Sequence, residues 1–130
     1  MIRTAPLEKP ELAIIGAGCA GLSLARQLVR TEKTSSIKAC LYGPVSPAAT
    51  NRHSWGFWAT QGLEEQTELA RQRWHKWQII TAERKVTQTA DSHPYCRLDS
   101  RDWLTHCLNI IDGNIQQEPD SLPTPGAQPV

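Results

Sequence analysis

The sequence has almost no net charge and no long hydrophobic segment, and each absence excludes a class of protein. Its 14 Lys and Arg residues nearly balance 13 Asp and Glu residues, which gives a formal net charge of +1. Basic and acidic residues are also interleaved along the chain, so no nucleic-acid partner is expected. No apolar run approaches the roughly 18 residues that a membrane span needs. Peripheral contact with a membrane stays open.

Signals for metal binding and secretion are also missing. The four cysteines form no CxxC pair or other metal-ligand spacing, so we expect no metal site. The first ten residues contain charges and two prolines instead of the apolar core of a signal peptide. We therefore expect a cytoplasmic location, with the inner face of the membrane as a peripheral alternative.

The most informative segment that is present reads LAIIGAGCAGLSLARQL, from Leu12 to Leu28. Its apolar start, Leu12–Ile15, is typical of a strand buried in a parallel sheet. From Leu22 onward the apolar residues follow helical spacing. A GxGxxG motif therefore lies between a strand and a helix. In this context the motif is typical of dinucleotide-binding units.

Each glycine of the motif has a physical task. Gly16 allows a tight turn, Gly18 lets the backbone approach a pyrophosphate, and Gly21 lets the helix pack closely on the strand. The first amides of the helix and its dipole would then attract the phosphates. The motif predicts a dinucleotide cofactor, with FAD and NAD(P) both open.

A second apolar segment, Ile37–Tyr42, completes a strand–helix–strand unit of about 30 residues. We therefore predict an α/β fold, a partial Rossmann-type FAD/NAD(P)-binding domain with a β-hairpin side layer. A dinucleotide-binding unit usually ends its second strand with Asp or Glu, which binds the ribose. Gly43 stands at that position, and Arg52 is the nearest arginine that could meet a ribose phosphate. How the ribose is held stays open.

The rest of the chain yields coarser expectations. The N-terminal portion 1–117 is expected to fold, and the proline-rich residues 118–130 are expected to be a disordered tail. A helix is predicted over about 62–76, with one face formed by Leu63, Thr67, Ala70, Trp74 and Trp77. A hairpin is predicted over Thr81–Thr89 and a strand over Tyr95–Leu98. After them we expect a helix start at Asp99 and Ser100 and a strand over Asn109–Gln116.

The segment NRHSWGFW, Asn51–Trp58, is unusually aromatic for a connecting loop. Together with the glycine motif it resembles the start of bacterial lycopene cyclases, which are FAD-dependent flavoproteins of carotenoid synthesis. The likeness covers about residues 11 to 112. It implies that Arg52 lies near the cofactor. It also implies that the FAD pyrophosphate is surrounded by Gly16, Ala17, Gly18, Cys19, Ala20 and Gly21.

The resemblance also implies a reaction. Family members use reduced flavin without net redox turnover; they protonate one end of the apolar polyene lycopene, and the cation closes to a ring. The family's acidic catalytic motif has no match in these 130 residues, so the catalytic residues are unknown. We expect a truncated cofactor-binding portion that is inactive alone. The alternatives are another FAD/NAD(P)-dependent oxidoreductase and a non-catalytic remnant.

Overall fold

The computed structural model describes residues 10–31, 37–44 and 53–121, which form a mixed α/β structure with eight strands and three helices. The chain divides into two compact units, Met1–Ser46 with Leu104–Val130, and Pro47–Trp103. The glycine motif belongs to the first unit and the aromatic segment to the second. Within the described ranges, none of the helices combines the length and hydrophobicity that a membrane crossing requires.

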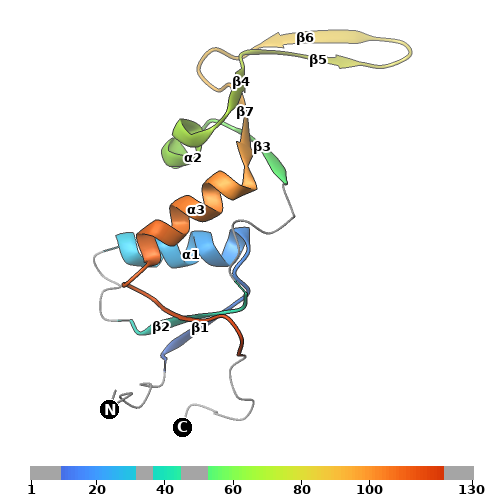
Figure 1. The fold of residues 1–130 in the computed structure, drawn as a ribbon. Helices are drawn as coiled ribbons and strands as arrows, with labels where there is room; N and C mark the ends of the chain where they lie inside the picture. Colours follow the sequence, from blue (N-terminus) through green and yellow to red (C-terminus); the bar gives the residue numbers. More distant parts are fainter. Residues whose placement is uncertain (1–9, 32–36, 45–52, 122–130) are drawn as a thin grey trace, which may run out of the picture. The chain divides into compact units, whose positions relative to one another are not determined.

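The first unit contains a parallel sheet in the order β1-β2-β8. Strand β1 (Leu12–Ile15) pairs with β2 (Ala39–Tyr42), and β2 pairs with β8 (Gln116–Glu118). Helix α1 (Cys19–Arg30) connects the first two strands (Figure 1). The strand–helix–strand unit predicted from the sequence is therefore confirmed, with the second strand starting at Ala39 instead of Ile37.

Helix α3 (Ser100–Ile111) corrects the predicted strand over Asn109–Gln116. Its Trp103, Cys107 and Ile111 recur every four residues and are all buried, which is a helical period. The helix ends before Gly113, whose φ of +75° is the left-handed conformation typical of helix C-termini. Strand β8 is formed only by Gln116–Glu118, which follow this turn. That strand includes the first residue of the predicted tail, while residues 122–130 lie outside the described part.

The second unit contains an antiparallel sheet in the order β3-β7-β4, the short helix α2 (Glu64–Leu69) and a separate hairpin. The strands are β3 (Ser54–Trp58), β4 (Gln72–Trp74), β5 (Lys76–Ile80), β6 (Lys85–Thr89) and β7 (Tyr95–Asp99). The predicted strand at Tyr95 and the predicted hairpin are confirmed. The hairpin begins earlier than expected, because Trp77 and Ile79 pair across the strands with Gln88 and Val86.

The predicted helix over about 62–76 is wrong beyond its first half. Helix α2 stops at Leu69, Ala70 is extended, and Trp74 pairs with Tyr95 across β4 and β7. The Trp58 ring lies 4.9 Å from the Tyr95 ring and 5.7 Å from the Trp77 ring, measured between centroids. Trp77 of β5 thus packs on the Trp58 ring, and Trp74 lies in β4, so neither belongs to the continuous helix face that their spacing suggested.

Candidate functional site

The turn after β1 is fixed by a glycine conformation and by one hydrogen bond. Gly16 has a φ of +105°, a region that side-chain-bearing residues rarely adopt. Its N–H donates to the Tyr42 carbonyl at 2.8 Å, which ties the end of β1 to the end of β2. The chain therefore leaves the sheet at a defined place and direction, immediately before α1.

The close contact between α1 and this turn depends on Gly21. A Cβ atom at this position would lie 1.8 Å from the Gly16 carbonyl oxygen and 3.4 Å from Cγ2 of Ile14. No other residue fits without moving the helix away from the turn, since real Cβ contacts are never that short. Gly21 thus has the packing role that the motif predicts.

Gly18 differs from Gly21 because the space beside it is open. It is the N-cap residue of α1, with φ −88° and ψ −162°, and no side chain caps the helix there. A Cβ atom at Gly18 would meet no atom within 4 Å. Gly18, Cys19 and Ala20 are all exposed. The amides of this first turn lack intrahelical partners, so the turn offers donors and a positive dipole end to an anion.

The end of β2 lacks the usual carboxylate for a structural reason. Gly43 has a φ of +123°, and a Cβ atom there would lie 3.4 Å from the Ala17 nitrogen. An acidic residue at this position would therefore have a strained backbone, although the 3.4 Å distance itself is an ordinary van der Waals contact. Arg52, the other residue predicted near the cofactor, lies outside the described residues.

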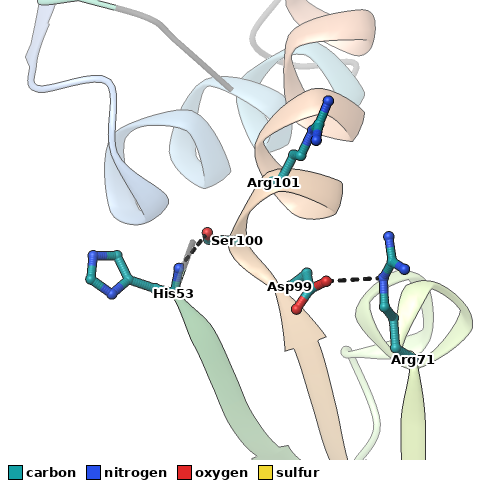
Figure 2. A pocket seen from close by; sticks show the side chains of 5 residues that line it. All are labelled: His53, Arg71, Asp99, Ser100 and Arg101. Atoms are coloured by element: carbon teal, nitrogen blue, oxygen red, sulfur yellow. Dashed lines mark hydrogen bonds and ion pairs between the residues drawn. The ribbon is translucent and has the colours of Figure 1, made fainter. Parts of the chain in front are cut away.

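A second polar site, a pocket of about 280 Å³, lies in the second unit. Figure 2 shows the five residues that line it, which are His53, Arg71, Asp99, Ser100 and Arg101. The His53 N–H donates to Ser100 Oγ at 3.1 Å, and the Ser100 N–H donates to the His53 carbonyl at 2.8 Å. This reciprocal pair joins the start of β3 to the start of α3, and the predicted helix start at Ser100 is confirmed.

Two carboxylates surround the Arg71 guanidinium at this pocket. Arg71 donates to both oxygens of Asp102, at 2.6 and 3.0 Å, and its Nε lies 3.0 Å from Asp99 Oδ2. The hydrogen bonds to Arg71 lower the pKa of Asp102, and the same bonds raise the pKa of Arg71. Sequence analysis missed this cluster, because the paired residues are 31 positions apart.

The Arg71–Asp102 pair is expected to stabilise the fold at neutral pH and to lose this effect in acid. The folded-state pKa of Asp102 lies below its ordinary value of 3.8, so the contribution is present above that pH and is lost as the pH falls through the lower folded value. Asp102→Asn should therefore destabilise the chain at pH 7, and the difference should shrink below about pH 4. Urea unfolding at several pH values measures this, with Asp91→Asn as a control. A difference that is equal at every pH would contradict the assignment.

The comparison with protein families decides the identity of the chain. Residues 11–111, most of its length, match the family described as lycopene cyclase protein. The chain belongs to the lycopene cyclase family. The resemblance found in the sequence is thereby confirmed. A search among curated proteins found no match.

Solved structures share the fold of this lycopene cyclase family chain at low sequence identity. PqsL from P. aeruginosa, in complex with 2-aminobenzoylacetate, is 16% identical with a TM-score of 0.62, over 84% of this chain and 33% of PqsL. A PqsL variant with four substitutions is 15% identical with a TM-score of 0.62, over 85% and 32% of the two chains. An MHPCO variant is 11% identical with a TM-score of 0.59, over 86% and 32%. The chain thus spans about a third of each of these proteins.

Proposed function

We propose that this chain binds FAD by holding the pyrophosphate at the glycine turn, Gly16–Gly21. The observation that carries the proposal is the uncapped, exposed first turn of α1 beside the open space at Gly18. Ala17, Cys19 and Ala20 contribute backbone to the same turn. The parallel order β8-β2-β1 supports a Rossmann-type arrangement, because it corresponds to the 3-2-1 half of the doubly wound sheet.

Family membership supports a role in carotenoid synthesis. We propose that this protein takes part in cyclising the end of an apolar polyene such as lycopene by protonation, with reduced FAD and no net redox change. FAD would supply the reduced flavin for that chemistry. The residues of this chain would bind and orient FAD, and no described residue is assigned as the catalytic acid. Contact with the inner face of the membrane would give access to an apolar substrate.

A second candidate is an oxidoreductase that binds NAD(P) at the same turn, since the motif serves both cofactors. Titrations of the purified chain with FAD, NADH and NADPH separate the two. Saturable FAD binding with no nicotinamide binding supports the flavoprotein proposal. Nicotinamide binding alone supports the second candidate, and binding of neither supports a non-catalytic remnant.

Cys19 offers an independent test because it lies in the proposed site. It is exposed, whereas Cys40, Cys96 and Cys107 are buried. Burial raises the pKa of the Cys40 and Cys96 thiols, which makes them poorer nucleophiles. Iodoacetamide is therefore expected to modify Cys19 first, and saturating FAD should slow that reaction about tenfold or more, as a site 90% occupied would. Mass spectrometry of the alkylated peptides measures both effects.

Cys19→Ser is the matched control for this experiment. It should remove the fast alkylation and keep FAD binding, because the turn acts through backbone amides. Protection by NADH but not by FAD would move the assignment to the nicotinamide candidate. Alkylation of Cys19 at an unchanged rate in saturating FAD would show that the cofactor does not cover the turn.

A further inference from the structure

The further inference concerns the ribose of the bound cofactor and rests on the proposed function. In dinucleotide-binding units, a carboxylate at the end of the second strand accepts hydrogen bonds from the adenosine ribose. Here that place is taken by Gly43, whose φ of +123° is strained for any residue that carries a side chain. If the chain binds a dinucleotide, the ribose hydroxyls need another acceptor near the same edge of the sheet.

The sheet brings Glu118 to that edge from a distant part of the sequence. Glu118 is the last residue of β8 and stands in register with Tyr42, the last residue of β2. The Gly43 N–H donates to the Glu118 carbonyl at 3.1 Å. Neighbouring strands lie about 4.8 Å apart, so Glu118 is one strand away from the expected acid position. Ligands of open parallel sheets bind at this carboxyl edge.

The Glu118 side chain is suited to the role. It is half-buried, and its Oε1 accepts a hydrogen bond from Gln116 Nε2 at 3.0 Å, which restrains the carboxylate. A carboxylate has two oxygens with about four acceptor sites, so it retains the capacity to bind ribose hydroxyls while Gln116 holds one oxygen. Its negative charge would also oppose a phosphate on the ribose.

We propose that Glu118 is the ribose-binding carboxylate of this chain and replaces the acid that is missing after β2. The site would accept a dinucleotide with free 2′- and 3′-hydroxyls on its adenosine ribose. It would disfavour a 2′-phosphorylated ribose of the NADP type.

The test uses the full chain and three small probes, ADP, 2′-deoxy-ADP and adenosine 2′,5′-bisphosphate, titrated by calorimetry beside FAD. The native chain should bind ADP more tightly than 2′-deoxy-ADP. Glu118→Gln should weaken FAD and ADP about tenfold or more, because a hydrogen bond to a charged group is lost. It should also abolish the preference for the 2′-hydroxyl and improve binding of the 2′-phosphorylated probe. Asp120→Asn, an exposed carboxylate two residues away, is the control and should change none of these affinities.

The outcomes separate this inference from the proposed function. If the native chain binds neither FAD nor ADP, the proposed function fails and the ribose assignment fails with it. If FAD and ADP bind, but Glu118→Gln keeps the preference for ADP over 2′-deoxy-ADP, only the ribose assignment is overturned. A far-ultraviolet circular dichroism spectrum of Glu118→Gln that matches the native spectrum verifies that lost binding is not lost folding.

Discussion

Gly21→Ala is expected to destabilise the first unit by about 3 kcal/mol, the upper end of the range for overpacked sites. The added methyl group would lie 1.8 Å from the Gly16 carbonyl oxygen, which is backbone and cannot rotate away. Helix propensity alone predicts the opposite sign, a gain of about 1 kcal/mol when glycine becomes alanine inside a helix. The sign of the change in unfolding free energy, measured by urea denaturation, therefore decides whether the close packing of α1 on the turn is real.

Gly18→Ala is the matched control for that experiment. It adds the same methyl group three residues away, where a Cβ atom meets nothing within 4 Å. It should cost only about 0.5 to 1 kcal/mol, because alanine is a poorer N-cap residue than glycine, and this loss is well below the one expected for Gly21→Ala. Stabilisation of the chain by Gly21→Ala would contradict the described contact between α1 and the turn.

Gly18→Asp is expected to separate FAD binding from stability. Aspartate is a favourable N-cap residue and would accept hydrogen bonds from the first amides of α1, so the fold should keep its stability or gain a few tenths of a kcal/mol. The same carboxylate would accept the hydrogen bonds of the backbone amides that are proposed to bind the pyrophosphate, and it would repel the pyrophosphate charge. Together these effects should weaken the binding free energy by several kcal/mol. FAD affinity should therefore fall about 100-fold or more. Titration calorimetry and urea denaturation of the same preparation measure the two effects.

Ser92→Asp is the charge-matched control, because it adds one negative charge at an exposed turn of the second unit. It should bind FAD like the native chain. Loss of affinity in both variants would indicate a general charge effect, whereas undiminished binding by Gly18→Asp would rule out the first turn of α1 as the pyrophosphate site.

The sequence predicted the strand–helix–strand part of the first unit well, because the signals there are local. The strand bounds Leu12–Ile15 are those of the structure, and the apolar spacing after Gly21 correctly indicated a helix. The glycine conformations follow from the motif as well, since a strand that turns at once into a helix needs a positive φ at Gly16. Here the residues that decide the local structure are neighbours in the chain.

Prediction failed where partners distant in the chain decide the structure. Trp74 and Trp77 are three residues apart, a spacing that fits a helix face, but the pairing of Trp74 with Tyr95 places it in a strand. The same limit hid the pairing of Arg71 with Asp102 and the approach of Glu118 to Gly43. Parallel and antiparallel registers are set by tertiary packing, and a single sequence carries little information about them.

Strand β1 has one neighbour, β2, among the described residues, and its last residue, Ile15, is 66% exposed. The outer side of such a strand presents backbone donors and acceptors in the spacing that another strand recognises. In doubly wound sheets the fourth strand lies beside the first, on this same side. A separately produced polypeptide that carries such a strand would dock there by β-augmentation. Strand β1 is therefore the edge of this sheet at which a further strand is expected to pair.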